Sequence, residues 1–346
     1  MSGIFDSGWA RRLLDTLGRY GEVEALVTGT TGTTALLDAR MEGEIKIIRG
    51  RWSAWLREHK GYDIAITATH TVDPERVRAE CFHISRIVPD APLVGIDTCS
   101  MTVIPWADGT ESFAARLARE LGFRTAGPKD YGTTFWREGE RECRRVLGVN
   151  EGDWILINWI VVGRARSRDI LIVKERGRIE IRGAEVKEHG LEKLGDLNLA
   201  EAKIDTIVTL RGEVRRRRRV SLKKTNVIAF INHAGYDVYD FLGMNISGAV
   251  TVGDDTTAIA GDILSRYGVP VIGITDGDSD GLLPMARYAR GSLILRVAKD
   301  DNFGRRVFEE IFGNRTSIEG GMKELKRAIL EMAKGEGILR GESSES

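Results

Sequence analysis

Through residues 227–312, short apolar segments alternate with longer segments whose apolar residues have helical spacing. This alternation restricts the chain to a small number of fold classes. Each apolar segment ends in a polar turn, so we interpret it as a buried strand that leads into a helix. Strands that alternate with helices usually form a parallel sheet with helices on both faces. The predicted strands are Val227–Ile231, Ala249–Val252, Val269–Thr275 and Ser292–Val297, and the predicted helices are Tyr236–Leu242, Thr256–Tyr267 and Asn302–Phe312.

The first 150 residues alternate in the same way, so the chain is expected to be α/β throughout. Between residues 151 and 225 the segments Trp154–Val162, Asp169–Lys174 and Arg178–Ile181 are predicted strands without helices between them, and Arg176-Gly177 is typical of a hairpin turn. We therefore expect two Rossmann-like parallel-sheet domains, 1–150 and 151–334, with a β-rich connection over 151–225. Residues 335–346 are expected to be a disordered tail. The first half is also predicted to hold the strands Val23–Thr28, Ile45–Ile48, Asp63–Ala68 and Leu93–Asp97, and a helix over Glu138–Leu147.

Three aspartates follow the third predicted strand of the second half. Asp276, Asp278 and Asp280 are each separated by one small residue, so in an extended chain they point to the same side. Carboxylates this close repel one another unless a cation or amide donors neutralise them. Asp254 and Asp255 follow the preceding strand and would face them from the same edge of a parallel sheet.

This motif favours a site for Mg²⁺ or Mn²⁺, because both ions prefer hard carboxylate oxygens. A calcium EF-hand loop requires Glu at its twelfth position, where this chain has Arg287, and a helix rather than a strand before it. The alternative interpretation is structural: aspartates cap helices and close turns, as Asp300-Asp301-Asn302 would do. The candidate metal ligands are Asp254, Asp276, Asp278 and Asp280.

Other residues would assist such a site. His233 ends the first strand of the second half and is the candidate general base, although a strand-end histidine is as often structural. Asp255 is the candidate to position water or add a ligand.

A phosphate could bind the turn between a predicted strand and helix, where glycines, hydroxyls and a helix N-terminus combine. That turn matches neither a Walker loop nor GxGxxG, and it also occurs for steric reasons. Its residues are Gly29, Thr30, Thr31, Gly32, Thr33 and Thr34.

Composition argues against several classes of protein. Lys and Arg number 51 and Asp and Glu number 51, so no global charge directs the chain to nucleic acid or membrane. Arg215–Arg219 could contact a nucleic acid, but a charge run is more often a solvated loop. Three scattered cysteines support neither a disulfide framework nor a zinc site. With no apolar run of about 20 residues and no signal-peptide pattern, we expect a cytoplasmic protein without a membrane segment.

Several motifs resemble an archaeal domain-of-unknown-function family known mainly from methanogens. The resemblance spans most of the chain and implies an archaeal cytoplasmic protein, without implying an activity. The motifs that carry it are DSG (6–8), TGTTGTTALLDA (28–39), VGDDTTAIAGDIL (252–264), PVIGITDGDSDG (270–281), GSLILRV (291–297) and DDNFG (300–304).

The C-terminal half also resembles the topoisomerase–primase (Toprim) catalytic domain in its order of strands and helices. In that domain an Asp-x-Asp pair binds Mg²⁺, and Asp276 and Asp278 match the pair. The glutamate expected after the first strand is absent, since Asn232-His233 stands there. The resemblance therefore implies metal binding more strongly than it implies cleavage or synthesis of a nucleic acid.

Together these patterns predict a Mg²⁺-dependent enzyme that acts on a phosphate-bearing small molecule or nucleotide, the nucleotide also being a candidate cofactor. Two alternatives stay open. One is a Toprim-like protein that processes nucleic acid through Arg215–Arg219. The other is a non-catalytic ligand-binding or assembly protein whose acidic turns are caps.

Overall fold

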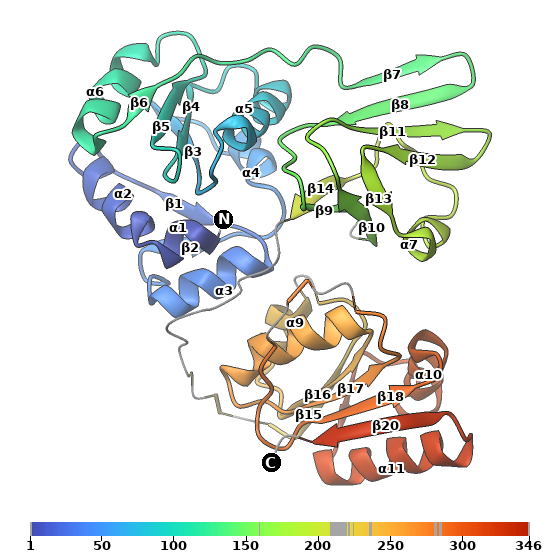
Figure 1. Ribbon diagram of the computed structural model, residues 1–346. Coiled ribbons are helices and arrows are strands. Elements are labelled where there is room, and N and C mark those ends of the chain that lie inside the picture. The colour runs from blue at the N-terminus through green and yellow to red at the C-terminus, as the bar shows by residue number, and fades with distance from the viewer. Residues whose placement is uncertain are drawn as a thin grey trace. The chain divides into compact units, whose positions relative to one another are not determined.

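The computed structural model describes residues 2–158, 160–207, 220, 222–223, 225–234, 237–279, 282–283 and 286–344. The chain divides into two compact units (Figure 1). Unit 1 comprises Met1–Val27 and Gly50–Thr209, and unit 2 comprises Thr28–Arg49 and Leu210–Ser346. Among the described residues, no helix has the length and apolar character needed to cross a bilayer.

Unit 1 begins with an α/β layer around a mixed sheet of order β3-β4-β5-β6. Strands β3 and β4 are parallel, as predicted, but β5 pairs antiparallel to β4. The reason is the connection: only residues 98–101 separate β4 from β5, which suffices for a hairpin and not for a parallel crossover. The elements are α1 (Ser2–Asp6), α2 (Trp9–Leu17), β1 (Ala25–Val27), α4 (Trp52–Glu58), β3 (Ala65–Thr69), α5 (Glu75–Ile87), β4 (Leu93–Asp97), β5 (Thr102–Pro105), α6 (Glu111–Leu121) and β6 (Arg124–Thr125).

The rest of unit 1 is β-rich, as predicted, and consists of two antiparallel sheets of order β12-β11-β8-β7 and β13-β10-β9-β14. Buried residues of both sheets, among them Ile157 and Ile172, share one apolar core. Arg176 and Gly177 form the predicted hairpin turn, each with positive φ. The elements are β7 (Phe135–Glu138), β8 (Arg141–Val146), β9 (Trp154–Ile157), β10 (Ile160–Ala165), β11 (Ile170–Glu175), β12 (Arg178–Arg182), β13 (Ala184–Val186), α7 (Glu188–Glu192) and β14 (Ile204–Ile207).

The helix predicted over Glu138–Leu147 is wrong, because these residues form most of the β7–β8 hairpin. Gly139 has a φ of 62° in the turn between the strands. Charged side chains of the hairpin are neutralised across the two strands, with Arg137 paired to Glu142 at 2.7 Å.

Unit 2 is built on a six-stranded sheet of order β19-β15-β16-β17-β18-β20. The four central strands are parallel and the two edge strands antiparallel, which largely confirms the predicted parallel sheet. The elements are α3 (Thr30–Ala39), β2 (Ile45–Ile47), β15 (Val227–Ile231), α8 (Asp237–Gly243), β16 (Gly248–Val252), α9 (Asp254–Ser265), β17 (Val271–Thr275), β18 (Leu293–Val297), α10 (Asp300–Arg306), a π-helical turn (Val307–Ile311), β19 (Ser317–Glu319), α11 (Met322–Gly335) and β20 (Leu339–Ser344).

Helices cover both faces of this sheet (Figure 1). Phe303 of α10 and Ile329 of α11 pack into the apolar core on one face. Val238 of α8 and Ile263 of α9 pack into the core on the other face. Alternate residues of each central strand point to the two cores, so the strands are apolar on both sides, as expected for a buried parallel sheet.

The division between the units differs from the predicted boundary near residue 150. The β-rich segment belongs to unit 1, and α3 belongs to unit 2 although it lies early in the chain. A buried ion-pair network holds α3 to α9: Arg266 contacts Asp38 at 2.9 Å and Asp262 at 2.7 Å, with all three side chains nearly inaccessible. Thr34 and Tyr239 add a hydroxyl contact of 2.6 Å between α3 and α8.

The tail predicted to be disordered contains a strand. Residues 339–344 form β20, which pairs antiparallel with β18 at the edge of the unit 2 sheet. The polar sequence of this tail did not predict the strand, because hydrogen bonds between backbone groups hold strands together. An edge strand also needs few buried side chains.

Candidate functional site

The four parallel strands of unit 2 end at one edge of the sheet, and polar residues follow each of them. Asn232 and His233 follow β15, and Asp254 follows β16 at the start of α9. Asp276 follows β17, and Asp300 begins α10 shortly after β18. We call this region the acidic edge. It is the place where open α/β sheets bind ligands.

Three carboxylates meet at the acidic edge. Asp254, Asp276 and Asp278 each offer an oxygen, and these oxygens lie within 4.8 Å of one another. Asp254 also shapes the turn that carries the other two, because its Oδ2 accepts the backbone N–H groups of Asp276 at 3.1 Å and of Gly277 at 2.9 Å. The predicted convergence of β16 and β17 aspartates is therefore present for these three residues.

The electrostatics of this cluster are unfavourable to three ionised carboxylates. Burial, followed by the charge of Asp278 and then that of Asp254, raises the pKa of Asp276 above its ordinary value. Its Oδ1 is buried and has no hydrogen-bond partner among the described residues. A divalent cation would supply both the missing partner and the missing positive charge.

Asp300 is a fourth acid of the acidic edge that sequence reasoning interpreted only as a helix cap. Its side chain is buried, with 8% of the residue exposed. Burial, followed by the charge of Asp276, raises the pKa of Asp300 to about 6. The cap interpretation is wrong for Asp300, because Lys299 is the N-cap residue of α10 and no side chain caps the helix. Asp300 Oδ1 instead accepts the N–H of the next residue, Asp301, at 2.6 Å. The available signal in the sequence was an Asp three residues after the end of β18, which is the next strand beside β17.

Asp255 lies beside the carboxylate cluster and outside it. Its Oδ1 accepts the hydroxyl of Ser279 at 3.4 Å and the backbone N–H of Leu282 at 3.3 Å. These contacts tie the segment after the Asp276–Asp278 turn to the start of α9. The predicted role of Asp255 in positioning water stays a prediction.

The remaining predicted residues have mixed outcomes. His233 is exposed at the acidic edge, one strand away from Asp254 and outside the three-carboxylate cluster. Asp280 and Arg215–Arg219 lie outside the described residues.

The Gly29–Thr34 turn forms the N-terminus of α3, with Gly29 as the N-cap residue. Thr33 and Thr34 are buried, at 3% and 4% exposed, and the Thr34 hydroxyl donates to the backbone of Thr30 at 2.7 Å. Only Gly29, Thr30 and Thr31 are partly exposed. Any phosphate contact is therefore confined to the first half of the predicted loop.

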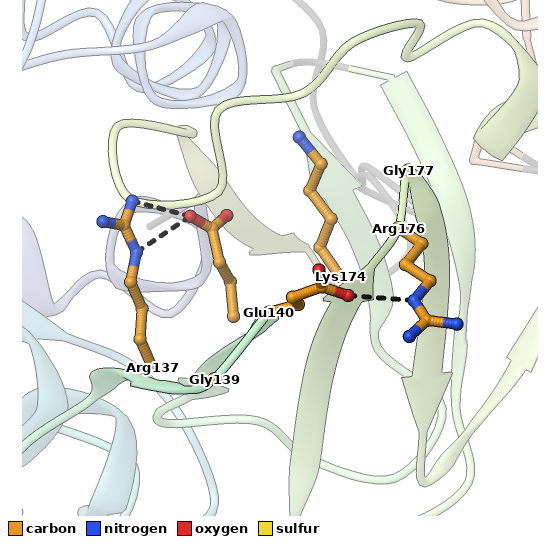
Figure 2. A pocket seen from close by; sticks show the side chains of 7 residues that line it. Arg137, Gly139, Glu140, Lys174, Arg176 and Gly177 are labelled. Carbon is orange, nitrogen blue, oxygen red and sulfur yellow. Dashed lines mark hydrogen bonds and ion pairs between the residues drawn. The ribbon is translucent and has the colours of Figure 1, made fainter.

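A hollow on unit 1 has a different character (Figure 2). Its volume is about 440 Å³, and its walls carry charges of both signs. Figure 2 shows Arg176 bonded to Glu140, and the pair is 2.9 Å apart. Lys174 pairs with Asp196 at 3.1 Å. Because these charges neutralise one another within the protein, the hollow has no need of a ligand ion, and we do not assign it a function. It is lined by Arg137, Gly139, Glu140, Glu142, Lys174, Arg176 and Gly177.

Comparisons with known proteins agree with the sequence motifs. A family model described as "Uncharacterized protein conserved in archaea (DUF2117)" matches residues 2–315, which include the four acids of the acidic edge. The Uncharacterized protein MJ0065 of Methanocaldococcus jannaschii is 32% identical over 317 residues, covering 87% of each chain. No solved structure matches the chain.

Proposed function

The chain belongs to this family of uncharacterized proteins conserved in archaea, and from that premise we propose that it is a Mg²⁺-dependent enzyme acting on a phosphate-bearing small molecule or nucleotide. The observation that carries the proposal is the approach of the Asp254, Asp276 and Asp278 carboxylates to within 4.8 Å at the end of a parallel sheet. Mn²⁺ has the same ligand preference and would substitute for Mg²⁺.

The donors fit such an ion. Asp254, Asp276 and Asp278 would hold it with carboxylate oxygens, and the buried, unpartnered Oδ1 of Asp276 is the oxygen that best supports a cation contact. When bound, the ion supplies positive charge that stabilises negative charge developing on a phosphoryl group. Asp254 would keep the turn in place through its bonds to two backbone N–H groups.

Two further roles complete the proposal. His233, exposed at the acidic edge, would take the proton from the attacking group. Gly29, Thr30 and Thr31, at the N-terminus of α3 in the same unit, would bind a second phosphate group of a nucleotide.

Titration calorimetry with Mg²⁺ and Mn²⁺, with and without a nucleotide, tests the proposal. We expect the wild type to bind either ion and the Asp276→Asn/Asp278→Asn variant to bind at least tenfold more weakly. The matched control is Glu309→Gln/Glu331→Gln, which removes two exposed carboxylates from the same unit. Absence of binding heat from a folded wild type would contradict the proposal, and so would equal affinity in the two double variants.

A non-catalytic ligand-binding or assembly protein is the second candidate. It is favoured by the bonds from Asp276 N–H and Gly277 N–H to Asp254, which are those of a structural turn. In that case Asp254→Asn changes the stability of unit 2 and leaves the affinity for nucleotides and divalent ions unchanged.

A Toprim-like protein is the third candidate, because the Asp276-Gly277-Asp278 pair carries two of the clustered carboxylates. It predicts binding of DNA or RNA that weakens steeply with salt and with neutralisation of Arg215–Arg219. No binding at low salt would exclude it.

We propose that the protein is located in the cytoplasm, because its cysteines are free thiols. Cys81, Cys99 and Cys143 are all free thiols, and Cys99 is exposed. Free thiols are typical of a reducing compartment.

A further inference from the structure

Arg296 lies against the turn that carries Asp276 and Asp278. It is an exposed residue of β18, directly opposite Thr275 of β17 in the sheet register. Its Nε–H donates to the backbone oxygen of Asp276 at 3.3 Å. Its guanidinium covers Gly277, where an added Cβ would collide with Nε, Cζ and Nη2. The absence of a side chain at Gly277, whose φ is +92°, therefore makes room for this guanidinium.

The guanidinium forms no ion pair with the described residues, although the clustered carboxylates stand on the turn beneath it. Arg266 of the same unit, for comparison, pairs with two aspartates. A guanidinium has five N–H donors, and the bond to Asp276 uses only Nε–H. The Nη donors of Arg296 remain available beside the cluster.

Two acidic side chains near Arg296 have few hydrogen-bond donors around them. Asp300 is 8% exposed and accepts a single hydrogen bond, from Asp301 N–H, among the described residues. Asp276 Oδ1 is buried without a partner. The carboxylates could therefore accept contacts from a cation, and the Nη groups of Arg296 could donate to an anion. A divalent ion together with a phosphate group would satisfy both, because carboxylates bind the ion and a guanidinium binds phosphate in a planar, bidentate manner.

We infer that Arg296 binds a phosphate group of the ligand, beside the metal ion that Asp254, Asp276 and Asp278 would hold. This inference rests on the proposed function and extends it by assigning the anion-binding side of the site. Arg296 orients the anion and takes no part in proton transfer. Its positive charge also repels the metal ion, so its loss affects the two ligands in opposite directions.

Two sequential titrations test the inference, first Mg²⁺ into the protein and then inorganic phosphate into the Mg²⁺-saturated protein. We compare wild type, Arg296→Gln and Arg296→Lys, with Arg327→Gln on the exposed face of α11 as the matched control. For Arg296→Gln we expect phosphate affinity to fall at least tenfold while Mg²⁺ affinity stays unchanged or rises. Arg296→Lys keeps the positive charge but loses the bidentate geometry of the guanidinium. Its phosphate affinity is therefore expected to lie between those of wild type and Arg296→Gln.

The outcomes separate the two proposals. Loss of Mg²⁺ affinity in Arg296→Gln would mean that the arginine supports the turn itself, and would overturn the inference. Equal phosphate affinity in wild type, Arg296→Gln and Arg327→Gln would overturn it as well, leaving the metal site intact. If the folded wild type binds no Mg²⁺, the proposed function and the inference fail together.

Discussion

Asp97 in unit 1 and Asp276 in unit 2 occupy comparable places, each at the carboxyl end of a strand with a parallel neighbour. Asp97 is fully buried, and donors surround both of its oxygens. Oδ1 accepts the N–H of Cys99 and the N–H and hydroxyl of Ser100, and Oδ2 accepts the hydroxyl of Thr69 and the N–H and hydroxyl of Thr71.

Asp276 has the opposite surroundings. Its Oδ1 has no partner among the described residues, and the charges of the Asp278 and Asp254 carboxylates raise its pKa further. Asp97 is the last residue of one apolar strand and Asp276 directly follows another, so the two positions look alike in the sequence. The two aspartates differ in the number of hydrogen-bond donors around them. Asp97 joins two loops through its six hydrogen bonds, whereas the buried Oδ1 of Asp276 accepts none from the described residues.

The largest effect is expected at the satisfied carboxylate. Asp97→Asn places an NH₂ group against N–H and O–H donors, and we expect unit 1 to lose about 3 kcal/mol or more of its free energy of unfolding. Tryptophan fluorescence during denaturation measures this directly, because all seven tryptophans belong to unit 1. Asp90→Asn, an exposed aspartate of the same unit, is the control. Equal stability of the two variants would remove Asp97 from the comparison.

A smaller effect is expected from Mg²⁺ on unit 2. Binding to the folded state alone stabilises by about 2.7 kcal/mol when the ion is at about one hundred times its dissociation constant. Hydrogen exchange of β16 and β17 should therefore slow in Mg²⁺ relative to EDTA, with β3 and β4 of unit 1 as the internal reference. Unchanged exchange in unit 2 at saturating Mg²⁺ would count against a metal site.

In the absence of metal, the free energy of unfolding of unit 2 should depend on pH, and this effect should be smaller than the effect of Mg²⁺. The raised pKa values of Asp276 and Asp300 mean that the folded state binds protons more tightly than the unfolded state. This stabilisation is full below the unfolded pKa of about 4 and is lost as pH rises through about 6, the folded pKa of Asp300. We expect unit 2 to lose about 1 kcal/mol across this window in EDTA, after allowance for screening.

Hydrogen exchange of β17 between pH 4 and 7, corrected for the intrinsic exchange rate, measures this loss. Asp300→Asn removes the main titrating group and should flatten the profile. A wild-type profile that already lacks the slope would indicate that the acids are neutralised by the protein itself.

Sequence reasoning predicted the central sheet of unit 2 because its signals are local. Four apolar strands, each followed by a polar turn, specify parallel pairing, and the parallel strands bring Asp254 next to Asp276 and Asp278. The same reasoning missed Asp300, since its membership depends on how far the start of α10 reaches over the edge of β17. The segment Asp300-Asp301-Asn302 has a composition typical of helix caps, and this composition gave no sign that Asp300 is buried.

The unpredicted features depend on contacts between distant residues. The assignment of α3 to unit 2 rests on the pair Arg266–Asp38, and no local pattern links those two positions. The position of Arg296 against Gly277 also requires two strands to be in register. The β7–β8 hairpin was not predicted, because it depends on the turn at Gly139 and on the pairing of β8 with β11, which lies further along the chain.

The most direct test of the contrast is the stability of unit 2 in Asp276→Asn, measured by hydrogen exchange of β16 and β17 in EDTA and in Mg²⁺. Removing one of several repelling carboxylates should leave unit 2 at least as stable as wild type in EDTA, and Mg²⁺ should no longer stabilise it. Destabilisation in EDTA together with a full response to Mg²⁺ would contradict the account, because Asp276 would then be a structural carboxylate like Asp97.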